Sequence, residues 1–403
     1  MSEGTLALLG GAPAFESAVP VGQLYFPDWP DYVEAMRGIF VRQYYTNQGP
    51  LVRELESALQ ERLGVRHAIC VANATIGLMM AADALGLRGR VITSAFSFIA
   101  TSQSLTWAGL DPLFCDVDAS SHHLDPDRVE HALRQEDVSA VLAVNLWGDV
   151  CDHEALSRLA ARRGVPLYFD SAHAFGCEAG ARAVGGFGAL EVFSFHATKV
   201  LSAAEGGCVC TNDDMLAARL RNIRSSYGAG APVHVRRTAN GRMSEAQAAI
   251  ALMSLKGFPS ILERNRALFA AYEAGLQSVQ GLRLLRPAAV NRTNYQYVVC
   301  EIDAGVFGLD RDQLHAVLRA ENILARRYFY PGIHRCMPYR EQFPSAPADL
   351  PVTEVLCSRV LQLPIGQAVD EAAVARITAV VRAAQTNAQL VRAVLAGQGE
   401  VHA

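Results

Sequence analysis

Short apolar runs separated by amphipathic stretches follow one another along the first half of this 403-residue chain. A run of four to seven apolar residues is typical of a strand buried on both faces, and a longer stretch with apolar residues three or four apart is typical of a helix. The expected strands are 67–72, 91–94, 112–117, 139–145, 166–170, 190–195 and 208–211, with helices starting near 51, 73, 98, 125 and 154. This alternation predicts an α/β fold with a mostly parallel central sheet flanked by helices.

The pattern changes in the second half of the chain. After a helix over 215–223 and a glycine-rich loop, Ser244 is expected to cap a helix over 245–255, followed by a long helical stretch over 258–276. Further on, expected strands (294–302, 323–329) and helices (311–319, 371–384, with a helical tail) predict a smaller α/β C-terminal domain. We therefore divide the chain into an N-terminal arm (1–50), a large domain (51–257) and a small domain (258–403).

The charge and composition exclude several classes of protein. The 36 basic and 40 acidic residues give a net charge of -4, and no long basic run predicts binding to nucleic acid or to an anionic membrane. No apolar stretch approaches the roughly 18 residues that span a bilayer, and the first residues do not resemble a secretory signal. The nine cysteines contain no C-x-x-C pair, so we expect reduced thiols, no metal site and a soluble cytoplasmic protein.

Polar residues stand where several expected strands end. In a parallel α/β sheet, the ligand crevice lies beyond the carboxyl ends of the strands, and Asn73, Trp147, Asp170 and His173 all occur there. A carboxylate buried alone is very costly, so Asp170 is expected to be paired or used, although a helix-capping aspartate would also fit. The turn at 73–75 has the small residues of an anion-binding helix start, but from the local sequence alone ordinary N-capping by Asn73 or Thr75 is the favoured explanation.

Lys199 lies in a turn between two of the expected buried strands. Removal from water favours the neutral amine, the form that attacks a carbonyl to make a Schiff base. An exposed loop lysine is equally compatible with the local sequence. Asp170 precedes Lys199 by 29 positions. This arrangement fits an enzyme that uses pyridoxal phosphate (PLP), in which a carboxylate keeps the pyridine nitrogen protonated and the ring able to accept electrons.

The residues around Lys199 also resemble a known segment. The sequence from Ser194 to Lys199 (SFHATK), followed by Glu205-Gly206-Gly207, looks like the S-F-x-x-x-K…G-E-G-G segment of the DegT/DnrJ/EryC1/StrS family, with Ala204 where a glycine is often found. These are PLP-dependent sugar aminotransferases of fold type I, and the resemblance extends over essentially the whole chain. It implies that Lys199 is the catalytic residue and forms a Schiff base with PLP, and that Ser194 contacts the phosphate.

Other positions carry over from the same resemblance. Asp170 matches the aspartate that binds the pyridine nitrogen, and His173 matches the position, often glutamine, that contacts the ring hydroxyl. Asn240 resembles a residue that reaches the phosphate from the neighbouring subunit, which implies a homodimer with shared active sites. The remaining cofactor-binding positions are two in the phosphate-binding turn and one aromatic that stacks on the ring: Ala74, Thr75 and Phe98.

Two segments are candidates for the substrate site. The residues Arg326 to Phe329 (RRYF), with Pro331 and His334, are similar to the family's R-x-Y-F…P…H stretch near the sugar-nucleotide. The candidate substrate-binding residues there and in the tyrosine-rich arm are Tyr45, Asn47, Arg326, Tyr328 and His334. The short segments at 146–148, 195–199 and 296–298 most resemble the corresponding segments of enzymes that aminate C-4 of a nucleotide-linked 4-keto-6-deoxyhexose. The resemblance implies L-glutamate as donor and a cofactor that cycles through pyridoxamine phosphate.

Several alternatives are compared with this interpretation. A 3-keto-sugar or amino-cyclitol aminotransferase of the family would share every cofactor residue. The family's sugar dehydratases resemble this chain but have histidine at the lysine position, so Lys199 disfavours them. A catalytically silent ligand-binding protein is disfavoured because Lys199, Asp170 and a phosphate-binding set are all present. No G-x-G-x-x-G follows a strand near the N-terminus, which disfavours a Rossmann dehydrogenase.

Overall fold

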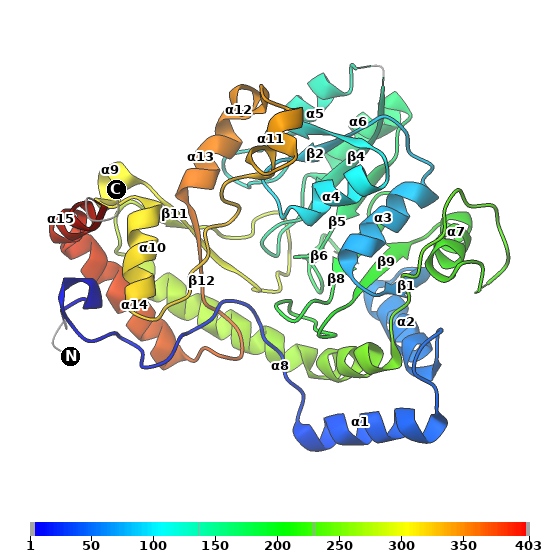
Figure 1. Cartoon of the computed structure of the whole chain (residues 1–403), viewed down its shortest axis with the longest axis horizontal. Helices are drawn as coiled ribbons and strands as arrows, with labels where there is room; N and C mark the ends of the chain where they lie inside the picture. The colour runs from blue at the N-terminus through cyan, green and yellow to red at the C-terminus, as the bar shows by residue number, and fades with distance from the viewer. Residues whose placement is uncertain (1–4, 136, 229, 400–403) are drawn as a thin grey trace.

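The computed structural model describes residues 5–135, 137–228 and 230–399. Its centre is a seven-stranded sheet with the order β1-β9-β8-β5-β4-β2-β3 (Figure 1). The strands are β1 (His67–Val71), β2 (Arg90–Ser94), β3 (Asp111–Cys115), β4 (Val138–Val144), β5 (Leu167–Asp170), β8 (Glu191–Ser194) and β9 (Gly207–Thr211). Only β9 runs against its neighbours β1 and β8. The predicted mostly parallel α/β sheet is therefore confirmed.

Helices cover both faces of this sheet. They are α2 (Pro50–Leu63), α3 (Ala74–Ala84), α4 (Ala100–Trp107), α5 (Pro126–Ala132), α6 (His153–Arg163) and α7 (Asp214–Ser225). Neighbouring residues of a strand pack into the hydrophobic clusters on opposite faces of the sheet. Cys70 packs in a cluster with α2, α5 and α6, and Ile69 packs in a cluster with α3, α4 and α7. Because both faces are buried, the strands read as near-continuous apolar runs rather than as alternating ones.

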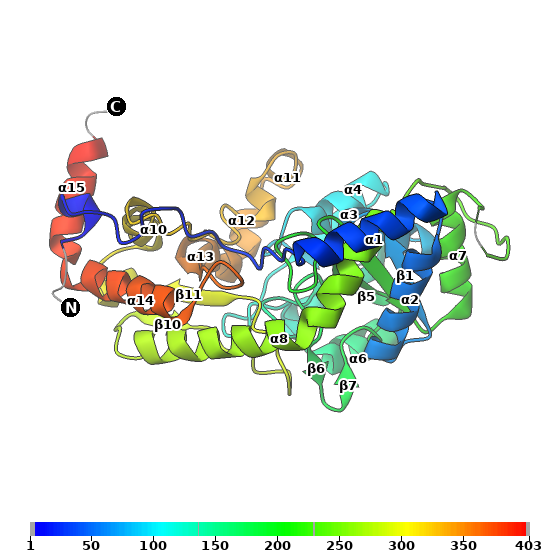
Figure 2. The same ribbon diagram turned by 90° about the horizontal axis from the view of Figure 1, so that it is seen from below.

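A single long helix connects the two halves of the molecule. Two helices were expected over 245–255 and 258–276, but α8 (Glu245–Leu276) is continuous and contains Pro259. Its first half, including Phe258, packs in the core beside the large sheet, and its second half, including Tyr272, packs in the second core. Burial at both ends outweighs the local cost of the proline. Figures 1 and 2 show α8 spanning the molecule, and the proposed domain boundary at 257 falls inside it.

The second core surrounds a small antiparallel sheet with the order β10 (Leu282–Leu284), β11 (Val298–Ile302), β12 (Val360–Leu363). The expected strand over 323–329 is wrong, because that segment makes only single bridges, from Ile323 to Val19 and from Arg326 to Gln362. The strand that pairs with β11 on this side of the sheet is β12. The other elements of this half are α9 (Ala304–Phe307), α10 (Arg311–Ala320), η2 (Ile333–Arg335), α11 (Tyr339–Gln342), α12 (Ala346–Asp349), α13 (Pro351–Arg359), α14 (Glu371–Thr386) and α15 (Ala388–Gly399).

The N-terminal arm runs along the outside of both halves. After the short helix η1 (Ala7–Leu9), the chain reaches α1 (Trp29–Arg42), which lies beside α8 and stands apart from the central sheet (Figures 1 and 2). A two-stranded hairpin, β6 (Glu178–Ala179) and β7 (Arg182–Ala183), follows β5. Among the described residues, no helix is long and apolar enough to cross a membrane.

Candidate active site

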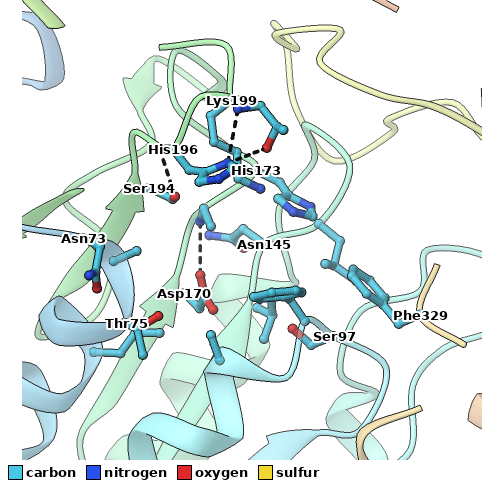
Figure 3. Close-up of a pocket in the computed structure, with 18 of the residues that line it drawn as sticks. Asn73, Thr75, Ser97, Asn145, Asp170, His173, Ser194, His196, Lys199 and Phe329 are labelled. Carbon is cyan, nitrogen blue, oxygen red and sulfur yellow. Dashed lines mark hydrogen bonds between the residues drawn. The ribbon is translucent and has the colours of Figure 1, made fainter. Parts of the chain in front are cut away.

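A cavity of about 370 Å³ opens at the carboxyl ends of the parallel strands. Asn73 follows β1, Ser97 follows β2, Asn145 follows β4, and Asp170 and Ser194 end β5 and β8. Figure 3 shows these side chains arranged around one hollow. The cavity therefore lies where a parallel α/β sheet places its ligand crevice. Its far wall comes from the second half of the molecule: Arg326, Tyr328 and Phe329.

Asp170 is the buried carboxylate of this cavity, with 6% of its surface exposed. The Thr101 hydroxyl donates to Asp170 Oδ2 at 2.8 Å, and the Ala172 backbone N–H donates to Oδ1 at 3.2 Å. Burial raises the pKa of Asp170, while these two hydrogen bonds and the charge of Lys199 oppose that rise. A carboxylate removed from water in this way is suited to bind a cationic group of a ligand.

Lys199 projects into the cavity from the loop between β8 and β9. The loop is closed by backbone hydrogen bonds, including Ala197 N–H to Ala204 O at 2.7 Å, and Ala204 has a left-handed φ of 62°. The Lys199 amine donates to the Tyr297 hydroxyl at 2.9 Å. Burial lowers the pKa of Lys199 to about 8, with Asp170 raising it and Arg326 lowering it further. About a tenth of the amine is therefore uncharged and nucleophilic at pH 7, several hundred times the fraction for a lysine with the ordinary pKa.

One end of the cavity is built to receive an anion. Asn73 caps α3 by accepting a hydrogen bond from Ile76 N–H at 2.9 Å, and Ala74 and Thr75 form the first turn. N–H groups in a first turn have no partner within their helix, and the helix dipole favours negative charge there. A Cβ at Gly207 would lie 2.8 Å from the Ala74 nitrogen, so only glycine lets β9 approach this helix end. Ser194 adds a hydroxyl to the same end.

His173 lies in the wall of the cavity, and its Nδ1 is buried without a hydrogen-bond partner among the described residues. Burial, followed by the charge of Lys199, holds the pKa of His173 well below its usual value, so the imidazole is neutral. Its ring packs 5.6 Å from Trp147 and 4.4 Å from Tyr297. A neutral imidazole with an unused nitrogen can bind a polar atom of a ligand.

Comparison with known proteins gives one consistent result. Residues 30–382 match the model of the DegT/DnrJ/EryC1/StrS aminotransferase family. A relative from Shigella dysenteriae named dTDP-4-amino-4,6-dideoxy-D-glucose transaminase is 32% identical over 87% of this chain and 94% of its own. The crystal structure of DesI in the presence of its TDP-sugar product is 42% identical, covers 96% of this chain and 98% of its own, and superposes with a TM-score of 0.92.

The chain belongs to the DegT/DnrJ/EryC1/StrS aminotransferase family.

The fold places most of the predicted site residues of this aminotransferase around one cavity. Nine of them line it: Ala74, Thr75, Phe98, Asp170, His173, Ser194, Lys199, Arg326 and Tyr328. Figure 3 shows Asp170, which ends β5, on the same hollow as Ser194 and Lys199, which come from the end of β8 and the loop after it. Phe98 stands at the mouth of the cavity, with 58% of its surface exposed.

Four predicted residues do not line the cavity of the single chain. Tyr45 and Asn47 are exposed on the loop after α1, where the Tyr45 ring packs on Phe40 at 5.5 Å. Asn240 is exposed on the loop between α7 and α8. His334 is buried, and its imidazole pairs with Glu354 on α13.

Two residues directly behind the cavity wall of this aminotransferase, Thr101 and Tyr297, and one that lines the cavity, His196, were not predicted as site residues from the sequence. Thr101 supports Asp170, Tyr297 contacts Lys199, and His196 lies at the rim, where its Nδ1 is 2.9 Å from the Thr198 hydroxyl. Tyr297 is 98 positions from Lys199, and although it lies in the expected strand over 294–302 and in the family-like segment at 296–298, nothing in either marks it as a partner of Lys199. A hydroxyl donor near a buried carboxylate was to be expected, but no local pattern in the sequence distinguishes Thr101 from its neighbours.

Proposed function

We propose that this protein is a PLP-dependent aminotransferase that moves an amino group from L-glutamate to C-4 of a nucleotide-linked 4-keto-6-deoxyhexose. The observation that carries the proposal is the partly buried Lys199 amine, with a pKa lowered to about 8, in one cavity with the buried Asp170. The substrate class is supported by the two relatives: one is named a dTDP-4-amino-4,6-dideoxy-D-glucose transaminase, and DesI was crystallised with a TDP-sugar product.

The residues of the cavity fit PLP. Asp170 would bind the protonated pyridine nitrogen, and the unused His173 Nδ1 would bind the ring hydroxyl. The first turn of α3 and Ser194 would hold the phosphate. Lys199 would attach the cofactor covalently through its amine. When bound, PLP supplies an electron sink that stabilises negative charge at a carbon atom that has lost a proton.

Lys199 has a second role in the proposed reaction, as a proton carrier. Once its amine is free, Nζ takes the proton from the α-carbon of the amino donor and returns it at the other reacting carbon, so the lysine ends in its starting state. A pKa of about 8 suits this task, because the amine exchanges protons readily near working pH. Asp170, which is held by Thr101 and Ala172, keeps its charge facing the cavity throughout.

Arg326 and Tyr328 are the proposed substrate-binding residues of the far wall. Arg326 Nη1 donates to the Tyr328 hydroxyl at 3.0 Å, which fixes the guanidinium beside the cavity. Both the carboxylate of glutamate and the diphosphate of a sugar-nucleotide are anions that a guanidinium binds well. We assign Arg326 to anion recognition during the two halves of the reaction.

We further propose a homodimer in which each subunit completes the other's site. Supporting this, the arm exposes several large apolar side chains that the chain does not cover: Phe26, Trp29, Phe40, Val41 and Tyr45. Asn240 and the predicted substrate residues Tyr45 and Asn47 are exposed too, outside the cavity of their own chain. Contiguous exposed apolar surface is typical of a protein interface. Light scattering should give twice the 43.5 kDa mass of the chain.

The decisive experiment supplies the purified protein with PLP, L-glutamate and a panel of carbonyl substrates: nucleotide-linked 4-keto and 3-keto deoxysugars and a keto-cyclitol. We expect 2-oxoglutarate and a 4-amino sugar, read by mass spectrometry and NMR. Turnover of only the 3-keto sugar or the cyclitol would replace the proposed substrate by that alternative. The Lys199→Ala variant should lose both turnover and the visible absorbance of bound cofactor, and wild-type turnover in this variant would contradict the assignment of Lys199.

A further inference from the structure

Tyr297, from the half of the molecule opposite Lys199, contacts the Lys199 amine. It directly precedes β11, and its hydroxyl accepts the hydrogen bond from Lys199 Nζ at 2.9 Å. Only 6% of Tyr297 is exposed. Three aromatic rings surround the phenol, with centroids at 4.4 Å for His173, 5.5 Å for Trp147 and 6.4 Å for Tyr328. The hydroxyl is therefore held in place by rings from both halves.

The backbone beside Tyr297 is docked onto the loop that carries Lys199. The Gln296 side-chain oxygen accepts a hydrogen bond from Val200 N–H at 2.6 Å. Two residues earlier, the Asn294 amide donates to the carbonyls of His173 and Phe175 at 2.9 and 3.0 Å. The Asn294 side-chain oxygen in turn accepts from Gln296 N–H at 2.9 Å. These buried bonds fix the position of the phenol relative to the lysine, so the contact does not depend on a flexible side chain alone.

The phenol suits both charge states of the lysine. Burial holds the pKa of Tyr297 well above its usual value, so Tyr297 stays neutral through the range in which Lys199 titrates. A neutral hydroxyl accepts a hydrogen bond from the ammonium and donates one to the free amine. Asp170 and Arg326 act on Lys199 through charge, and the imidazole of His173 is neutral. Among the described residues, Tyr297 is the one to which the Lys199 amine donates a hydrogen bond.

We propose that Tyr297 is a catalytic residue that holds the Lys199 amine whenever the amine is not bonded to the cofactor. This proposal rests on the proposed aminotransferase function. In it, Nζ takes a proton from one reacting carbon and gives it to the other, while the phenol neither gains nor loses a proton. Its contribution is orientation: without it, the flexible lysine chain would sample other rotamers during the proton transfer.

The first test uses the apo-protein, so it does not need cofactor or turnover. The chain has two lysines, Lys199 and the exposed Lys256, so cyanate labelling read by mass spectrometry gives a clean rate for each against pH. In Tyr297→Phe both forms of Lys199 lose a hydrogen bond, but the ammonium loses the stronger, charge-assisted one, so the Lys199 pKa should fall by about one unit. Labelling of Lys256 should not change. Tyr295→Phe, which removes a phenol two residues away, is the matched control and should keep the wild-type Lys199 profile.

The second test follows one half-reaction with L-glutamate in a stopped-flow instrument. With the protein saturated with PLP, Tyr297→Phe should slow the single-turnover rate by about 10- to 100-fold, with a larger isotope effect from α-deuterated glutamate. Tyr297→His should recover part of the rate. If Tyr297→Phe does not fold, the pH dependence of Lys199 labelling is measured on the apo form of Tyr297→His instead. Equal rates and equal Lys199 pKa in Tyr297→Phe and Tyr295→Phe would overturn the proposal. Failure of the wild-type half-reaction would instead overturn the proposed function.

Discussion

The Thr101 hydroxyl donates a 2.8 Å hydrogen bond to Asp170 Oδ2, and both side chains are buried, with Asp170 lining the cavity and Thr101 behind it. Thr101 is on α4, so a helix on one face of the sheet stabilises the charge at the end of β5. Burial alone would favour the protonated carboxyl, which cannot pair with a protonated pyridine nitrogen. The hydroxyl lowers the pKa of Asp170 and counteracts that effect.

Replacement of Thr101 by valine should therefore weaken PLP binding in a pH-dependent way. The shape is kept and the donor is lost, so the pKa of Asp170 rises further. Below that pKa the carboxyl is protonated and the pairing is lost. We expect PLP to bind about 10-fold more weakly near neutral pH, the value of one charge-assisted hydrogen bond, with the difference shrinking as the pH rises. Fluorescence titration at several pH values measures this. A pH-independent loss, equal to that of Thr106→Val on the same helix, would count against it.

The rate at which apo-protein recombines with PLP should rise with pH. The attacking form is the neutral Lys199 amine, and the pKa of Lys199 is lowered from 10.5 to about 8 by burial. The rate constant should therefore increase about 10-fold per pH unit below 8 and level off above it. Stopped-flow absorbance between pH 6 and 9.5 measures the midpoint. A midpoint near 10 would show that Lys199 is solvated like an ordinary lysine.

The same shift affects the stability of the apo-protein. Because the folded-state pKa of Lys199 is lower than the unfolded one, the unfolded chain binds more protons between about pH 8 and 10.5. In that window, the contribution of Lys199 to the free energy of unfolding rises with pH. Lys199→Met should remove this pH dependence and stabilise the apo-protein below pH 8, where the wild type must keep a charge in the cavity. Urea titrations of both proteins at pH 7 and 9.5 would measure the effect, and identical pH dependence would contradict it.

Gln247 connects the segment before α3 with the loop that carries Lys199, the two segments proposed to bind the cofactor. Its side-chain amide donates to the carbonyls of Glu205, at 2.7 Å, and Ala72, at 3.3 Å, while its oxygen accepts from Ser244 N–H in the capping box of α8. In Gln247→Glu the capping oxygen remains, but a carboxylate replaces the amide donor beside two carbonyls. We expect a PLP Kd about 10-fold higher, with α8 intact by circular dichroism. The exposed Gln277→Glu at the other end of α8 is the control, and equal Kd values would exclude the connecting role.

Much of the large domain was predictable because its strands are buried on both faces. A short, mostly apolar run such as Leu167–Asp170 is readily predicted to be a buried strand. Helices such as α3 begin at a recognisable N-cap, Asn73. The small domain was harder. The apolar segment around Ile323 was expected to be a strand, but the sheet position belongs to β12, whose four residues directly follow a helix. Local pattern cannot decide which of two short apolar segments pairs with β11, because that depends on tertiary packing.

The candidate site was predictable where order along the chain carries information. Asp170 and Lys199 follow successive parallel strands, so topology alone brings them together. One further signal was present: of 36 basic residues only Lys199 and Lys256 are lysines, so a lysine between two buried strands is unlike the general basic composition of this chain. Thr101 could not be found in this way, and Tyr297 was present in the family-like segment at 296–298 without a role, because the contacts of both residues join distant segments through packing. His334, in turn, sits in a family-like segment but pairs with Glu354.

The buried carboxylate of Glu245 fixes the start of α2, and its removal should destabilise the protein. Its two oxygens accept hydrogen bonds from Leu51 N–H and Val52 N–H, each at 3.0 Å, and its own N–H donates to Tyr45 O at 2.8 Å. One residue thus joins α8, α2 and the loop of the arm. Glu245→Ala leaves two N–H groups without their partner, so we expect the free energy of unfolding to fall by about 2–3 kcal/mol. Chemical denaturation measures this free energy.

The control is Glu263→Ala, which replaces an exposed glutamate on α8 and should change the free energy of unfolding by less than about 0.5 kcal/mol. Equal midpoints for the two variants would show that water replaces the carboxylate at this helix start.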